Sequence, residues 1–414
     1  MSAAVIYRNV NSSGFEYPQV FNTTVIPLQE GDGNFSYEKP SGLLRFSEEY
    51  MKYHGYFSAI VCAFGIFANL ANIIVLTRKN MISSTNWILM WLAVADLLTM
   101  MSYFPVSIHF YVLRDPMLSF PETKSIDWIR FLLFHSSFTI VCHTIAIWLT
   151  ITLAIFRYVF ICFPTRGSQL CTLQRAKLAI FLVCFSTVIV CVPNFMTNDI
   201  DFSRHSRIFN ASDPVYTIQL TALAAEHDII VKINYWVQAI IVKLIPCFLL
   251  TCLTIMLILA MHNANKRRQK LKSQGRKDDS DRAREHNRTT GMLLAIVVLF
   301  LITELPQGII TLLNSFDEKW YRDVYLPLGD LWDIMALLNN SINFVLYCTM
   351  SRVFRDTFVK VFCGCCPERR PGWLKLRTFE HKNGIPMKSM NSNRTNKDCD
   401  GSTVNTQLAA PNGE

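Results

Sequence analysis

Charged residues are scarce in this chain: Asp, Glu, Lys and Arg make up 17% of its 414 residues, while 51% are hydrophobic. A soluble domain of this size carries about 25% charged residues. The shortage is concentrated in blocks, and residues 131–156 contain no charged side chain. About 20 apolar residues are enough to cross the hydrocarbon core of a bilayer as a helix. The composition therefore predicts an integral membrane protein.

Cysteine is missing from the amino-terminal segment and from the loops that we expect to face the outside. The 13 cysteines lie in apolar stretches or in segments expected to face the cytosol. We therefore expect no structural disulfide on the outer face.

The amino-terminal segment, residues 1–53, is polar and lacks the apolar core of a signal peptide. Three acceptor patterns for N-glycosylation lie in it, which predicts an exposed, flexible extracellular tail. The same tripeptides recur at Asn287, Asn339 and Asn393, where we expect no glycan, so a single match is weak. The predicted glycosylation sites, including one in a later outer loop, are Asn11, Asn22, Asn34 and Asn210.

Seven apolar stretches are long enough to cross a bilayer: 54–77, 87–112, 131–160, 178–197, 233–261, 291–316 and 324–350. Lys and Arg crowd the loop after the fifth stretch, and such basic loops stay in the cytosol. We therefore predict an all-α membrane protein, a seven-transmembrane helix bundle at residues 54–350. Its amino terminus faces the outside of the plasma membrane and its carboxyl terminus the cytosol. The net charge of +9 reflects these loops, so we expect no nucleic-acid partner.

The segment after the last span alternates aromatic and basic residues at helical spacing (351–362, SRVFRDTFVKVF). It predicts an amphipathic helix on the inner membrane surface. The cysteines that follow, Cys363, Cys365 and Cys366, are candidate palmitoylation sites rather than a zinc site, because no further ligands complete one. Residues 367–414 are polar and are predicted to be a disordered cytoplasmic tail.

Asp96 lies in the middle of the second span, where an ionisable group is costly and usually functional. We expect Asp96 to meet the amides of Asn69, Asn339, Asn340 and Asn343. Such a group can be a hydrogen-bonded cluster that holds helices together, or a sodium or proton site that changes between states. The sequence leaves both alternatives open.

Lys243 and Glu304 each lie close to a proline inside a span, Pro246 and Pro306, and therefore near the middle of the membrane. Either charge alone would be expensive there, whereas a pair offsets the desolvation of both. We predict that the two residues pair across the fifth and sixth spans, at the floor of an outward-facing cavity. The alternative is that each binds water separately.

Asp330 and Asp333 are three residues apart near the outer end of the seventh span, so they share one face of that helix. They are either a solvated helix end or an acidic contact for a cationic group of a ligand. His135 and Thr139 in the third span complete the predicted pocket lining.

A further set of residues stands at defined depths in the spans: Asn69, the LAVAD run ending at Asp96, Arg157, Tyr158, Pro164, Pro246, Phe300, Pro306, Asn343 and Tyr347. Over about residues 54–362 this set resembles the rhodopsin-like G-protein-coupled receptors. The resemblance implies that Arg157 engages a heterotrimeric G protein when the sixth span swings outward, and that Tyr347 moves in to support it.

Four departures from that family narrow the resemblance. Phe156 replaces the acid that usually precedes the arginine, so we expect raised basal signalling. Glu304 replaces a tryptophan, Phe344 replaces a proline, and Leu132 stands near the position of the usual cysteine at the top of span three.

The segments HTIAIWLT, KLIPC, HNRTT, TELPQG and NNSINFVLYC are similar to invertebrate neuropeptide receptors of the myosuppressin, FMRFamide-like and sex-peptide (myoinhibitory peptide) group and to nematode serpentine receptors. That resemblance implies a short amidated peptide as ligand and coupling to an inhibitory-type (Gi/o) G protein. Arrestin and membrane lipid are the other expected partners, and sodium is the only candidate cofactor.

Other functions fit the sequence less well. Amine receptors have an aspartate where this chain has Thr139, and light receptors have a lysine where it has Leu337. A chemosensory receptor for a small molecule has the same architecture and remains an alternative. Against a transporter or channel, we see no internal repeat of broken spans. Against an enzyme, no catalytic constellation of acids or metal ligands is visible.

Overall fold

The computed structural model describes residues 42–115, 118, 121–203, 215–272, 297–313, 316 and 320–362. Its labelled helices are α1 (Gly42–Leu76), α2 (Ser84–Val106), α3 (Ile126–Cys162), α4 (Pro164–Leu170), α5 (Leu173–Val190), α6 (Val192–Thr197), α7 (Ala222–Glu226), α8 (Asp228–Trp236), α9 (Ile245–Lys272), α12 (Gly329–Met350) and α13 (Arg352–Phe362). A further apolar helix covers Val297–Leu313 and is called the 297–313 helix below. Three π-helical turns, Ser107–Val112, Val237–Leu244 and Tyr321–Tyr325, continue or precede these helices.

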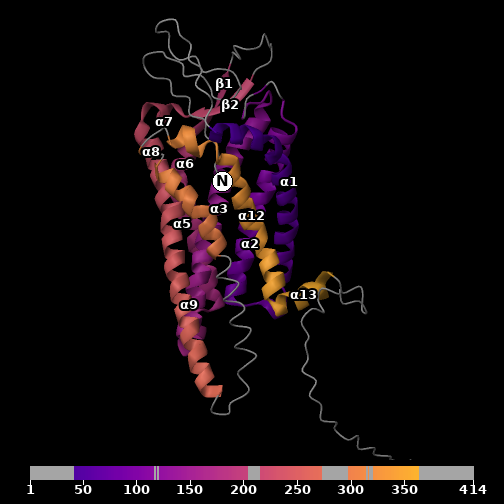
Figure 1. Ribbon diagram of the computed structural model, residues 1–414, viewed down its shortest axis with the longest axis vertical. Helices are drawn as coiled ribbons and strands as arrows, with labels where there is room; N and C mark the ends of the chain where they lie inside the picture. Colours follow the sequence, from indigo (N-terminus) through magenta and orange to yellow (C-terminus); the bar gives the residue numbers. More distant parts are fainter. Residues whose placement is uncertain are drawn as a thin grey trace, which may run out of the picture. The chain divides into compact units, whose positions relative to one another are not determined.

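The long helices run side by side as a bundle, with a β-hairpin at one end and α13 at the other (Figure 1). These are called the hairpin end and the α13 end below. Among the described residues, five helical stretches are long and apolar enough to cross a membrane: Gly42–Leu76, Ser84–Val112, Ile126–Cys162, Leu173–Thr197 and Ile229–Ala260. The acids and amides of α12 lower its hydropathy, and the 297–313 helix is shorter. The predicted helical bundle is confirmed.

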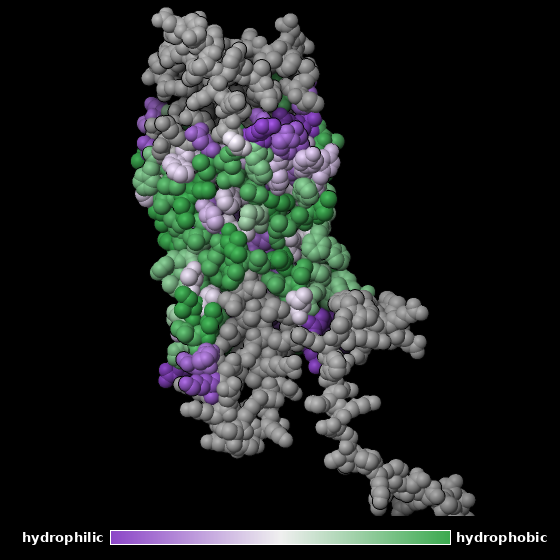
Figure 2. Space-filling view, in the orientation of Figure 1, coloured by the Kyte–Doolittle hydropathy of each residue, from purple (hydrophilic) through white to green (hydrophobic). Residues whose placement is uncertain are grey.

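The surface between the two ends is apolar (Figure 2). Large side chains such as Phe57, Phe181 and Phe248 are 55%, 64% and 68% exposed on it. In water this exposure would be unfavourable, but a lipid environment accommodates it. The outer surface is therefore the lipid-facing surface of a multi-pass membrane protein.

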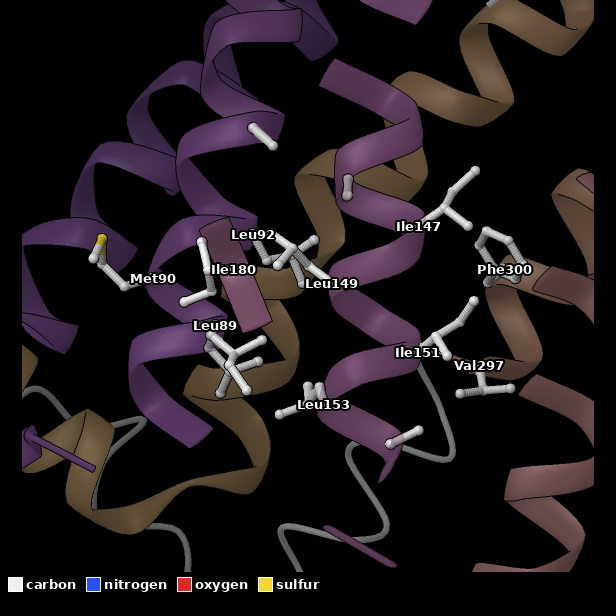
Figure 3. Packing of buried hydrophobic residues seen from close by; sticks show 14 of the residues in the cluster. Leu89, Met90, Leu92, Ile147, Leu149, Ile151, Leu153, Ile180, Val297 and Phe300 are labelled. Carbon is white, nitrogen blue, oxygen red and sulfur yellow. The ribbon is translucent and has the colours of Figure 1, made fainter. Parts of the chain in front are cut away.

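The bundle core is built from facing apolar stripes of neighbouring helices. Ile147 and Ile151 of α3 point toward Phe300 and Val297 of the 297–313 helix (Figure 3). Leu149, on another side of α3, is 0% exposed in the same cluster. α3 therefore contacts neighbours on several sides and lies at the centre of the packing.

Several helices begin or end outside the predicted apolar spans, and α1 and α3 are examples. α1 begins at Gly42 rather than at residue 54, and α3 begins at Ile126 rather than at residue 131. The extra residues of α1 include several charged side chains, and an exposed i,i+3 contact between Lys52 Nζ and Glu49 Oε1 (2.8 Å) supports the helical turn there. Hydropathy reports the part of a helix that lies in lipid, so it missed the part that extends beyond.

The hairpin at one end of the bundle was not predicted. β1 (Asn198–Ser203) pairs antiparallel with β2 (Val215–Leu220), from Asn198 opposite Leu220 to Ser203 opposite Val215. Thr123, just before α3, exchanges two backbone hydrogen bonds with Tyr216 (3.1 and 2.9 Å). Ile218 packs against Ile129 of α3 and its buried neighbours. Backbone pairing and apolar packing thus attach the hairpin to the start of α3.

The amphipathic helix predicted at 351–362 is α13. Phe354 is 1% exposed, and its ring centroid lies 5.4 Å from that of Tyr347 and 6.2 Å from that of Phe344. Asn80 Nδ2 donates to Thr357 Oγ1 at 2.8 Å and links α13 to the turn after α1. Phe344 stands where the rhodopsin-like receptors usually have a proline. Its ring is therefore part of the contact that holds α13.

The close contact of α1 with the turn after α2 depends on Gly55. A Cβ at this position would lie 2.5 Å from Tyr111 Cβ and 3.2 Å from the Tyr111 carbonyl carbon, whereas a Cβ on Gly42 would meet nothing within 4 Å. We expect Gly55→Ala to lower stability by about 1–3 kcal/mol, the usual cost of overpacking. Thermal unfolding of the detergent-solubilised protein measures it. Equal melting temperatures for Gly55→Ala and Gly42→Ala would contradict the contact.

Candidate functional site

The middle of the bundle contains a buried ionic cluster. Lys243 Nζ donates to Glu304 Oε2 at 2.7 Å and to Gln307 Oε1 at 2.8 Å. His143 Nε2 of α3 lies 3.1 Å from Glu304 Oε1. All four side chains are buried, and Glu304 is 1% exposed. The predicted pair of Lys243 and Glu304 is present, and two further residues join it.

Local backbone features position this cluster. Lys243 lies in the π-helical turn Val237–Leu244, whose wider turn re-aims side chains and is frequent at functional sites. Gly308, one residue after Gln307, lets this turn approach, because a Cβ there would lie 3.0 Å from Lys243 Cβ. Lys243 therefore lies close enough to the 297–313 helix to pair with Glu304.

The two acids of α12 lie near the hairpin end, each bonded to a tyrosine. Tyr111 OH donates to Asp330 Oδ1 at 2.7 Å, and Tyr103 OH donates to Asp333 Oδ2 at 3.1 Å. His54 of α1 lies 3.0 Å from the same Tyr103 hydroxyl. Asp333 is 6% exposed, so the interpretation of these acids as a solvated helix end is wrong for Asp333. The two acids do share one face, as predicted.

His135 and Thr139 of α3 both have partners within the bundle. His135 Nδ1 lies 2.8 Å from Ser102 Oγ of α2, and its ring packs edge-on against Tyr103 at 5.3 Å. The Thr139 hydroxyl donates to the carbonyl oxygen of His135, at 2.8 Å, in its own helix. His135 thus contacts Tyr103, which bonds to Asp333, whereas the Thr139 hydroxyl bonds to the backbone of its own helix.

Asp96 forms the predicted polar group with only part of the predicted set. Asn343 Nδ2 donates to Asp96 Oδ2 at 2.9 Å, and Asn69 Nδ2 donates to the carbonyl oxygen of Asn340 at 3.1 Å. Asp96 is 2% exposed. These contacts join α1, α2 and α12, and a sodium ion at Asp96 stays a prediction.

The prediction that Asn339 faces Asp96 is wrong. Asn339 lines an apolar groove with Ile60 of α1 and Ile302 of the 297–313 helix. Successive helical residues are 100° apart, and Asn340 already occupies the face toward Asn69. Asn339 therefore lies at the flank of α12.

Arg157 and Tyr347 lie at the α13 end. Arg157 is five residues before the end of α3 at Cys162, is half-buried, and interacts electrostatically with Tyr347, which is 2% exposed. Within the part of the chain that the structure describes, Arg157 has no acidic partner. Tyr158 is half-buried on the next position, and Pro164 begins α4. Coupling of Arg157 to a G protein stays a prediction.

Several predicted sites lie outside the described residues. These are the glycosylation sites Asn11, Asn22, Asn34 and Asn210 and the palmitoylation sites Cys363, Cys365 and Cys366. The described cysteines, among them Cys142 and Cys191 in the bundle, are free thiols.

The family model described as "Serpentine type 7TM GPCR chemoreceptor Srw" matches residues 56–365. The chain belongs to this family of seven-transmembrane G-protein-coupled receptors. The receptor is 29% identical to the G-protein coupled receptor dmsr-1 of Caenorhabditis elegans, over 82% of this chain and 73% of the relative. It is also 29% identical to the sex peptide receptor of Drosophila melanogaster, over 85% of this chain and 82% of the relative. Identity to the FMRFamide receptor of Drosophila melanogaster is 25%, over 73% of this chain and 52% of the relative.

Several residues that contact the predicted site residues were not predicted from the sequence, among them His143, Gln307, Tyr103 and Tyr111. The sequence signal for His143 was weak: it is an imidazole in a span without Asp, Glu, Lys or Arg. Nothing in the sequence marked Tyr103 and Tyr111 as partners of the two acids, since aromatic residues in a span usually serve in packing.

The lack of an acidic partner for Arg157 within the described ranges leads to a prediction on basal signalling. Phe156→Asp places a carboxylate next to the guanidinium, and we expect this to lower ligand-independent G-protein activation per surface receptor. Phe156→Asn is the matched control, because it removes the same ring without adding charge. If Asp and Asn variants signal alike, the missing acid does not set the basal level.

Proposed function

We propose that this receptor is activated by a short amidated peptide and couples to an inhibitory-type G protein. The relatives named for sex peptide and FMRFamide support a peptide ligand, since FMRFamide itself ends in Arg-Phe-amide. We propose the orientation with the hairpin end outside, so that the peptide enters there and Arg157 meets the G protein in the cytosol. Arrestin is proposed to bind the same side.

The observation that carries the proposal is the pair of carboxylates on α12 at the hairpin end. Asp330 is half-buried and uses one oxygen to accept a hydrogen bond from Tyr111. A peptide guanidinium forms charge-assisted bonds with such a carboxylate. Trp128 and Phe131 belong to the apolar cluster that packs against the hairpin; their rings lie edge to face at 6.0 Å and offer an apolar contact for a phenyl ring.

The experiment pairs a receptor variant with a peptide variant. An amidated peptide ending in Arg-Phe is compared with the same peptide carrying citrulline, which has the shape of arginine without its charge. We expect Asp330→Asn to weaken the arginine peptide about tenfold or more and to leave the citrulline peptide unchanged. Equal losses for both peptides would contradict a guanidinium at Asp330.

A chemosensory role is the second candidate, because the description of the matching family model contains the word chemoreceptor. Both roles use G-protein activation as the output, so the ligand distinguishes them. A response to small molecules together with silence toward a broad set of amidated peptides would favour the chemosensory role.

A further inference from the structure

Glu304 is shared by two bases from two different helices. Its Oε2 accepts from Lys243 in the turn before α9 at 2.7 Å, and its Oε1 lies 3.1 Å from His143 Nε2 of α3. Gln307, one turn later on the 297–313 helix, accepts a second hydrogen bond from the same lysine. One carboxylate thereby ties the 297–313 helix to two neighbours at once.

The cluster lies at one end of a continuous seam between α3 and the 297–313 helix. His143, Ile147 and Ile151 recur every four residues, so they form one stripe of α3. Glu304, Phe300 and Val297 recur at similar spacing on the facing helix. Figure 3 shows the apolar part of this seam, in which Ile147 and Ile151 point toward Phe300 and Val297.

The two parts of the seam hold the helix differently. Apolar contacts are non-directional, so the side chains can repack against new apolar neighbours, whereas a buried ion pair loses its compensation when its partners separate. The seam continues from the cluster toward Val297, at the start of the described part of the helix. If the Val297 end of the 297–313 helix moves away from α3, the helix must therefore rotate at Glu304 or break a contact of the Glu304 carboxylate.

We propose that His143, Lys243, Glu304 and Gln307 form a latch that holds the 297–313 helix against α3 without ligand, and that activation requires Glu304 to leave at least one of its bases. The proposal rests on the receptor's coupling to a G protein, but it does not depend on the ligand being a peptide. The contact between Glu304 and His143 is the part of the latch that reaches α3, and Lys243 and Gln307 hold the Glu304 carboxylate in place.

The test measures the position of the helix in the purified full-length receptor without ligand. Spin labels on unnatural amino acids replace Ile155 of α3 and Val298, which are 44% and 45% exposed on the bundle surface. Pulsed electron resonance gives the distance between them in lipid nanodiscs. The variants are Lys243→Met/Glu304→Gln, which removes both charges together, and His143→Phe, which removes only the α3 contact.

In both variants we expect the fraction of molecules with a longer distance between the labels to be about fivefold or more above that of the unsubstituted receptor. Such a change is within the usual range of allosteric couplings. Thr150→Val is the control, because among the described residues the one hydrogen bond of its hydroxyl goes to the carbonyl oxygen of Ala146 in its own helix. Distance distributions identical to the control would overturn the latch. Should the double variant not fold, His143→Phe alone decides, because it leaves the ion pair intact.

G-protein activation by the same variants separates the latch from the proposed function. Raised basal activation together with the longer distance supports both. A longer distance with no activation of any G protein supports the latch and contradicts the proposed coupling.

Discussion

Replacing Glu304 by glutamine alone is expected to lower the receptor's free energy of unfolding by about 3–5 kcal/mol, and adding Lys243→Met is expected to recover most of that loss. The single variant leaves Lys243, 6% exposed, as a buried charge without its carboxylate. The double variant removes both charges and needs no compensation. Thermal unfolding of the four proteins of this cycle, solubilised under identical conditions, measures the coupling.

An exposed pair on α1 provides the matched control. Lys52 Nζ and Glu49 Oε1 are also 2.8 Å apart, but their side chains are 61% and 63% exposed. Solvent screens this pair, so Lys52→Met and Glu49→Gln should have little effect singly or together. If the Lys243 and Glu304 substitutions were additive like those of the control, the two residues would not act as a pair.

Replacing Arg157 by glutamine is expected to reduce G-protein activation about tenfold to a hundredfold while ligand binding is kept. The expectation follows from the guanidinium's lack of an acidic partner among the described residues and from the value of one charge-assisted hydrogen bond, about 1.5–3 kcal/mol. Concentration–response curves for G-protein activation, with radioligand or fluorescent-ligand binding in parallel, measure it.

Arg166→Gln is the control for this experiment. Arg166 is an exposed arginine in α4, a few residues beyond the end of α3. Loss of a general positive charge would affect both variants, whereas loss of the specific contact affects only Arg157→Gln. Wild-type signalling by Arg157→Gln would remove Arg157 from the coupling surface.

The sequence predicted those parts of the site where a physical cost forces a partner. Lys243 and Glu304 were expected to pair because either charge alone is expensive in lipid and both stand near prolines. Asp96 and Asn343 followed from the same reasoning. His143 was missed because an imidazole can be neutral in a span, so its presence demands no counter-charge.

The arrangement beyond single helices could not be predicted. β1 and β2 are six residues each, and their position depends on the backbone pairing of Thr123 with Tyr216, which leaves no periodic pattern. Asn339 was misplaced because two adjacent amides cannot be assigned to faces until the rotation of α12 is known. Rotation and strand pairing arise from packing between segments far apart in the chain.

The central claim is that a peptide entering at the hairpin end activates a G protein through this bundle. Its most direct test is G-protein activation in cells expressing the receptor, across a library of amidated peptides with the free acid of each as a partner. We expect amidated peptides ending in Arg-Phe to activate an inhibitory-type G protein and their free acids to be much weaker. Activation by none of the peptides, with ion currents appearing on expression, would contradict it.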